Sequence, residues 1–144
     1  MMVMKNEEQK IEKTIAGKTV VITGGTSGVG RAAAEAFALE GCNVVVAARG
    51  QKGLDETVAL CRDLGAVALG VPTDVSIAED VNNLANLALQ FNGRIDFWVN
   101  NAGVMASGKF EDIPLNTVEQ VIKTNLLGYI HGAYTVLPIF KKQK

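Results

Sequence analysis

The sequence predicts an α/β fold with a doubly wound parallel sheet, and two observations carry this prediction. From residue 18 onward, short runs of β-branched residues alternate regularly with segments of helical periodicity. A glycine-rich turn also lies where the first of these runs passes into the first helical segment. Strands that alternate with helices form βαβ units with right-handed crossovers, so the sheet should be parallel and covered by helices on both faces.

Four strands are expected. The first, at residues 18–23 (KTVVIT), is a continuous apolar run, which is typical of a strand buried on both faces. The others are expected at residues 43–48, 67–71 and 95–99. The predicted spatial order is third, second, first, fourth, so the glycine-rich turn should lie at the carboxyl edge of a central strand.

Helical patterns fill the segments between these strands. Residues 31–39 are alanine-rich, and two further helices are expected at 52–63 and 77–91, with Asp74 and Ser76 as candidate caps of the last. One long helix is expected after Pro114, because apolar residues recur there at intervals of three and four. The stripe consists of Val118, Val121, Ile122, Leu126, Tyr129, Ile130, Ala133 and Leu137.

Composition and charge exclude several functional classes. The net charge is −1, from 14 basic and 15 acidic residues, so no nucleic-acid partner is expected. No apolar run approaches the ~18 residues of a membrane span, and no signal peptide is evident, so we expect no membrane partner and a cytoplasmic location. Cys42 and Cys61 fit no metal-binding spacing and His131 is the only histidine. We therefore expect free core thiols and no metal site.

The strongest chemical signal is the glycine-rich turn, Thr23–Gly30 (TGGTSGVG). Glycines between a strand and a helix let the backbone turn tightly and approach a pyrophosphate, while the helix N-terminus supplies N–H groups and a positive dipole. A glycine run by itself is equally compatible with a plain tight turn. The strand before it and the helix after it favour a nucleotide-binding site.

A second signal is the run Asn100–Gly103 (NNAG) directly after the fourth strand. Ligands of open parallel sheets bind beyond the carboxyl ends of the strands, and both this run and the glycine turn fall on that edge. Short amide side chains there can tie neighbouring strand ends together. If the run stood alone, an ordinary Asn-Gly turn that ends a strand would be the preferred interpretation.

Together these motifs resemble the short-chain dehydrogenase/reductase family. The resemblance rests on the glycine turn, on Asp74-Val75 after the third strand, on the NNAG run and on Asn125, and it extends from about residue 17 to the end of the sequence. It implies a Rossmann-type dinucleotide-binding domain at residues 17–144, preceded by a loose extension at 1–16. That domain would be incomplete after the fourth strand and its following helix.

The resemblance also implies roles for individual residues. The phosphate-binding turn would comprise Gly24, Thr26, Ser27, Gly28, Val29 and Gly30. The adenine would contact Asp74 and the Val75 backbone, and the nicotinamide ribose would contact Asn101, Ala102 and Gly103, with Asn100 as the strand-stabilising amide. Asn125 would be catalytic, holding a water in a proton relay. Two alternatives stay open: Asp74 as a helix N-terminal residue, and Asn125 as a core amide bonded to backbone.

Arg49 bears on the choice of cofactor. The end of the second strand is the usual place for a carboxylate that binds the ribose 2′-hydroxyl, but the sequence there reads Ala47-Ala48-Arg49. A carboxylate would repel a 2′-phosphate, whereas an arginine would attract one. NADP(H) is therefore favoured over NAD(H). The alternative is that Arg49 is an ordinary solvated loop residue.

The family's remaining catalytic residues, a serine and a Tyr-x-x-x-Lys, have no match in this sequence. Tyr129 and Tyr134 are its only tyrosines; neither is followed by lysine four residues later, and both are interpreted as packing residues. His131 on the helix and Lys109 in a loop are no candidates for the general acid. The chain is thus expected to be a C-terminally truncated piece, inactive alone, of an oxidoreductase.

That oxidoreductase would transfer hydride between NADP(H) and a small-molecule carbonyl or alcohol. The resemblance further implies a homo-oligomer for a full-length form, associating through the Asn125 helix and the helix that would follow it. The alternative function is a non-catalytic nucleotide-binding or partner-binding module.

Overall fold

The computed structural model describes residues 15–144, so all but the end of the predicted extension at 1–16 lies outside the described residues. Residues 15–17 form a turn that leads into the first strand. The elements are β1 (Thr19–Thr23), α1 (Gly28–Leu39), β2 (Asn43–Ala48), α2 (Gln51–Asp63), β3 (Ala68–Pro72), α3 (Ala78–Asn92), β4 (Phe97–Val99), η1 (Phe110–Asp112), α4 (Leu115–Ile122), η2 (Lys123–Leu127) and α5 (Gly128–Lys142).

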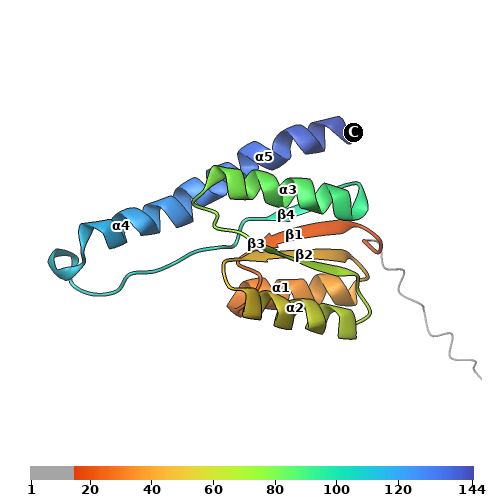
Figure 1. The fold of residues 1–144 in the computed structure, drawn as a ribbon, viewed down its shortest axis with the longest axis horizontal. Coiled ribbons are helices and arrows are strands. Elements are labelled where there is room, and N and C mark those ends of the chain that lie inside the picture. The colour runs from red at the N-terminus through yellow and green to blue at the C-terminus, as the bar shows by residue number, and fades with distance from the viewer. Residues whose placement is uncertain (1–14) are drawn as a thin grey trace, which may run out of the picture.

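The four strands form one parallel sheet in the order β3-β2-β1-β4, as the sequence predicts (Figure 1). Helices α1 and α2 cover one face of the sheet, and α3 and α5 cover the other (Figure 1). Alternate residues of each central strand point to opposite faces. Val20 and Ile22 of β1 therefore enter the core beneath α1 and α2, and Val21 enters the core beneath α3 and α5.

Both cysteines are free and buried in the part of the chain that the structure describes. Burial raises the pKa of the Cys42 and Cys61 thiols, because a thiolate loses hydration there. Each thiol lies against a backbone carbonyl, of Ile15 and Ala34 respectively. The prediction of free core thiols is confirmed.

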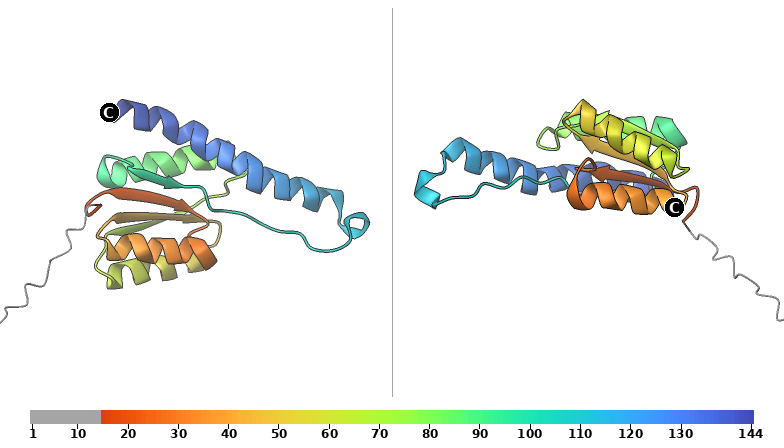
Figure 2. Two further views of the ribbon diagram at one scale, coloured as in Figure 1. Left: turned by 180° about the vertical axis from the view of Figure 1, so that it is seen from behind. Right: turned by 90° about the horizontal axis from the view of Figure 1, so that it is seen from below.

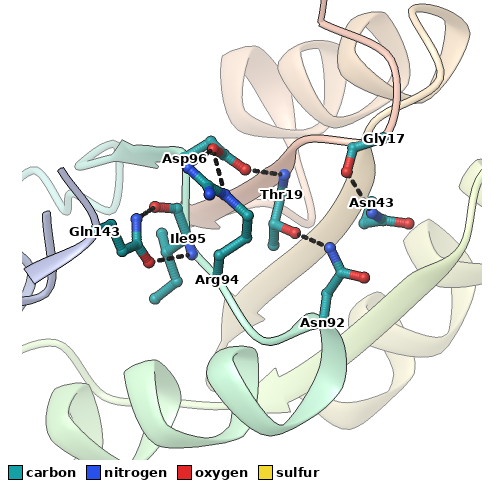
Figure 3. A network of polar contacts seen from close by, with 8 residues as sticks. All are labelled: Gly17, Thr19, Asn43, Asn92, Arg94, Ile95, Asp96 and Gln143. Atoms are coloured by element: carbon teal, nitrogen blue, oxygen red, sulfur yellow. Dashed lines mark hydrogen bonds and ion pairs between the residues drawn. The ribbon is translucent and has the colours of Figure 1, made fainter.

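Strand β4 is two residues shorter at its start than the predicted strand 95–99. The side chain of Gln143 accepts a hydrogen bond from the Ile95 N–H at 3.0 Å and donates one to the Ile95 carbonyl at 2.7 Å (Figure 3). Both backbone groups of Ile95 are thereby used by the last turn of the chain. The strand begins only at Phe97, and the end of α5 is tied to the sheet.

A polar network surrounds Asp96 at the amino end of the sheet (Figure 3). Its carboxylate accepts hydrogen bonds from the Thr19 N–H at 2.9 Å and from the Arg94 guanidinium at 2.7 Å. Burial alone would raise the pKa of Asp96, but these bonds to Arg94 and Thr19 outweigh it and lower the pKa. The network fixes β4 against β1 at the edge opposite the predicted site.

The single long helix expected after Pro114 contains a π-helical segment, η2, between α4 and α5. There the Gly128 N–H donates to the Lys123 carbonyl, five residues back. Such π segments are rare within helices and are often found at functional sites. Helix α4 extends past the edge of the sheet (Figure 2). In α5, the prediction that Tyr134 is a packing residue is wrong, because its side chain is 83% exposed.

The predicted capping of α3 by Asp74 and Ser76 is also wrong. The helix begins after Ile77, which makes no side-chain cap. Asp74 instead accepts hydrogen bonds from the N–H and hydroxyl of Ser76, at 3.0 and 2.6 Å. Asp80, in the first turn of α3, reaches back to the Asp74 N–H at 2.9 Å. Both aspartates therefore stabilise the loop before α3, and neither caps the helix through the predicted contact.

Candidate functional site

The glycine turn crosses the carboxyl edge of β1 in a conformation that needs glycine. Gly24 and Gly28 have positive φ angles of 66° and 50°, which side-chain-bearing residues rarely adopt. At Gly30 a Cβ would collide with the Gly24 carbonyl oxygen and with the Asn101 side-chain amide. Both the strand-to-helix turn and its contact with the neighbouring loop therefore depend on glycine.

The NNAG loop is joined to this turn by Asn101. Its side-chain amide donates to the carbonyls of Thr23 and Gly24, both at 3.1 Å. The Thr23 hydroxyl, almost fully buried, accepts from the N–H groups of Asn101 and Ala102 and donates to the Val99 carbonyl. The strand-stabilising role expected of Asn100 is thus carried by Asn101, with Thr23 as a partner that the sequence analysis did not single out.

Asn100 makes a different connection. Its side-chain oxygen accepts a hydrogen bond from the Trp98 indole at 2.9 Å, and its nitrogen donates to the Tyr129 carbonyl at 3.2 Å. A Cβ at Gly132 would collide with this amide. Asn100 therefore fastens the end of β4 to α5.

A cleft of about 250 Å³ opens at this carboxyl edge. Seven of the predicted cofactor residues line it, namely Gly24, Thr26, Arg49, Asp74, Val75, Ala102 and Gly103. The start of α1 follows directly in sequence and contains Ser27, Gly28, Val29 and Gly30. Asn101 does not line the cleft, but its side chain is bonded to the turn that does. The structure adds lining residues that the sequence analysis missed: Ala47, Ala48, Gly50, Thr73, Val104 and Thr124.

The N-terminus of α1 offers donors beside this cleft. Ser27 makes no side-chain cap, and the first helical bond runs from the Arg31 N–H to the Ser27 carbonyl. The first turn of a helix leaves backbone N–H groups without intrahelical partners and carries the positive end of the helix dipole. The N-terminus of α1 is therefore suited to binding an anion.

Arg49 and Asp74 line the part of the cleft that lies beyond the carboxyl ends of β2 and β3. Arg49 follows β2, is exposed, and makes no hydrogen bond or ion pair within the described chain. One carboxylate oxygen of Asp74 is used by Ser76. Val75 is buried, and its carbonyl is bonded by His131 of α5 at 2.8 Å.

Asn125 lies in η2, next to the cleft-lining Thr124. Its side chain is exposed, and both of its polar groups pair with the Val104 backbone, each at 2.8 Å. Of the alternatives weighed for this residue, the structure shows the amide bonded to backbone, although at the surface instead of in the core. The bonds place the π segment against the loop that follows the NNAG run.

A second pocket, of about 410 Å³, adjoins the cleft through Val104, which lines both. Among the described residues that line it, Asn125 alone has a polar side chain. The other lining residues are Val104, Met105, Ala106, Phe110, Ile113, Val118 and Val121. The pocket therefore suits an uncharged, apolar group.

Neither a metal nor a membrane site emerges from the described residues. Between residues 15 and 144 no three His, Cys, Asp or Glu side chains gather closely enough to hold a metal ion. In the same part of the chain no helix has the length and apolarity to cross a bilayer.

Comparison with known proteins gives a consistent result. A sequence model of the short chain dehydrogenase family matches residues 18–144. The uncharacterized oxidoreductase YxnA of Bacillus subtilis is 37% identical over 120 residues, which are 83% of this chain and 34% of YxnA. The 3beta-hydroxysteroid dehydrogenase 1 of Eggerthella lenta is 37% identical over 131 residues, which are 90% of this chain and 50% of that enzyme.

A solved structure is similar over the same region. The short chain dehydrogenase/reductase from Burkholderia phymatum, crystallised in complex with NAD, matches with a TM-score of 0.87 and 40% identity. The match covers 90% of this chain and 46% of that one. The chain thus spans between about a third and a half of the length of these relatives.

Proposed function

The chain belongs to the short-chain dehydrogenase/reductase family, and from this membership we propose that it forms the cofactor-binding part of an NADP(H)-dependent oxidoreductase. The observation that carries the proposal is the shared cleft. Seven residues chosen from four separate motifs line one cavity at the carboxyl edge of the sheet, where open α/β sheets bind nucleotides. When bound, a nicotinamide cofactor supplies or accepts the hydride.

The glycine turn is proposed to hold the pyrophosphate. Gly24 lines the cleft, and a Cβ at Gly24 would meet the Ala102 backbone, while a Cβ at Gly30 would meet the Gly24 carbonyl. Only glycine therefore lets the turn pack this closely against the NNAG loop at the edge of the cleft. The free N–H groups at the start of α1 would donate to the phosphate oxygens, and the helix dipole would favour their charge. The residues present therefore fit a dinucleotide phosphate.

We further propose that the cofactor is NADP(H), with NAD(H) as the competing candidate. Arg49 lines the cleft without a hydrogen-bond or ion-pair partner among residues 15–144, and the end of β2 carries no carboxylate to receive a 2′-hydroxyl. A guanidinium is well suited to a phosphate. The NAD complex of the Burkholderia phymatum relative supports the other candidate.

Substitution Arg49→Asp tests this choice. It should weaken NADP(H) binding by roughly 10- to 100-fold, because a charge-assisted hydrogen bond is worth about 1.5–3 kcal/mol. NAD(H) binding should improve, since the new carboxylate can accept from a 2′-hydroxyl. Calorimetric titration of both cofactors gives the two dissociation constants.

The matched control is Lys52→Asp, the same charge reversal three residues later. Lys52 lies on α2, is 92% exposed and does not line the cleft. This substitution should change the dissociation constants of NADP(H) and NAD(H) by no more than about twofold, because exposed charges are screened by solvent. If Arg49→Asp alters NADP(H) and NAD(H) affinity equally, Arg49 does not discriminate between them.

The substrate is proposed to be a neutral carbonyl or alcohol with an apolar body. The pocket beside Asn125 presents apolar side chains, and the one amide in it already has both polar groups bonded to Val104. We propose that selection there rests on apolar contact, because residues 15–144 contribute no free hydrogen-bonding side chain to its lining. Asn125 is proposed to act through the π segment that it anchors, which would position a water for proton transfer.

A further inference from the structure

We propose that His131 is a positioning residue for the adenine end of the cofactor: from helix α5 it holds the backbone of Val75 in place. The inference rests on the proposed function, in which the Asp74-Val75 segment receives the adenine. His131 does not line the cleft. It would act through Val75 alone.

The contact between the two residues is direct. His131 Nδ1 lies 2.8 Å from the Val75 carbonyl oxygen, across a sequence separation of 56 residues. A carbonyl can only accept, so Nδ1 carries the hydrogen and donates it. The side chain of α5 thereby fixes one backbone group of the loop between β3 and α3.

Packing brings α5 close enough for this contact. A Cβ at Gly128 would lie 2.6 Å from Val75 Cγ2, so the helix backbone touches the buried Val75 side chain. Gly128 and His131 are three residues apart and therefore lie on the same face of α5. Together they hold Val75 by its side chain and by its carbonyl.

Two of the three backbone N–H groups of residues 74–76 are held as well. The Asp74 N–H is bonded by Asp80, and the Ser76 N–H by the Asp74 carboxylate. Within residues 15–144 the N–H of Val75 is the one backbone donor of residues 74–76 that has no partner. His131 thus holds a cleft-lining residue in place while its N–H stays available for a ring acceptor of adenine.

Substitution His131→Phe keeps an aromatic ring on α5 but removes the donor. Without the bond the Val75 carbonyl is free to turn, and binding must then pay for ordering the loop. We expect about 3- to 10-fold weaker binding of adenosine 2′,5′-bisphosphate, the size of one ordinary hydrogen bond. Binding of nicotinamide mononucleotide should change by less than about twofold, because its part of the cleft lies at the NNAG loop.

Two further variants separate positioning from stability. In His131→Asn the amide nitrogen lies the same number of bonds from Cα as Nδ1, so it should restore binding of the adenosine bisphosphate to within about twofold of wild type. Thr135→Val is the matched control, because it removes the bond from α5 to Asn82 of α3 at 2.7 Å without touching the loop. It should leave both dissociation constants unchanged.

The measurement is calorimetric titration of residues 1–144 with each half-cofactor, beside urea unfolding of every variant. Equal losses for the two half-cofactors, or an Asn variant as weak as Phe, would overturn the positioning role. If His131→Phe does not fold, His131→Ala takes its place in the comparison. A wild-type chain that binds neither half-cofactor refutes the proposed function itself, and this inference with it.

Discussion

Replacing Gly30 by alanine should lower the free energy of unfolding by about 2 kcal/mol or more and abolish measurable cofactor binding. The added Cβ would collide with the Gly24 carbonyl and the Asn101 amide. Overpacking costs about 1–3 kcal/mol where side chains can adjust, and here one of the two obstacles is backbone. Alanine's better helix propensity returns only about 1 kcal/mol, so the collision dominates.

Urea unfolding of Gly30→Ala beside Gly50→Ala isolates this collision. Gly50 also adjoins a helix, but its φ is −93° and a Cβ there would meet nothing within 4 Å. Gly50→Ala should therefore be neutral, or stabilising by up to about 1 kcal/mol through the unfolded state. A Gly30→Ala variant as stable as wild type, with cofactor affinity retained, would show that the turn and the NNAG loop are not packed as described.

The polypeptide of residues 1–144, assayed alone, should oxidise no NADPH with any ketone or aldehyde. The sequence contains no tyrosine with a lysine four residues later, and Asn125 has its side chain committed to Val104. Without a general acid the rate is expected to fall by about 10²–10⁴-fold, which takes turnover below detection. A panel of carbonyl compounds followed at the NADPH absorbance band is the assay.

The same polypeptide should self-associate. Helices α4 and α5 and the segment η2 between them expose several apolar side chains, namely Leu115, Ile122, Leu126, Ile130, Tyr134 and Leu137. Exposed apolar surface favours association, and among the described residues β4 is an edge strand with no partner on its outer side. Gel filtration with light scattering reports the mass, and turnover from a monodisperse monomer would contradict both expectations.

The sequence suffices for those parts of the fold that periodicity governs. A continuous apolar run such as Val20, Val21 and Ile22 indicates a strand buried on both faces, and the glycine turn marks its carboxyl end. These features indicate the doubly wound fold class, whose usual strand order is the one observed. The grouping of Arg49, Asp74 and Gly24 around one cleft follows from the same topology.

Side-chain partners across long sequence separations escape such reasoning. Nothing local reveals that Gln143 takes both backbone groups of Ile95, 48 residues away, or that Asn101 and not Asn100 bridges β4 to β1. The π segment contains Asn125, which is bonded to Val104, and is followed by Gly128, which packs on Val75. Tertiary packing decides each of these. The apolar stripe after Pro114 predicts only one continuous helix and does not reveal the π segment within it.

The central claim is that an NADP(H) cofactor occupies the cleft at the carboxyl edge of the sheet. Hydrogen–deuterium exchange of the chain, with and without saturating NADP⁺, tests it most directly, because it locates the ligand even in a self-associated sample. Exchange should slow in the glycine turn at 24–30, around Arg49, at 73–76 and at 101–104, and stay unchanged on the outer face of α2. Unchanged exchange in all four segments, or protection confined to other parts of the chain, would contradict the account.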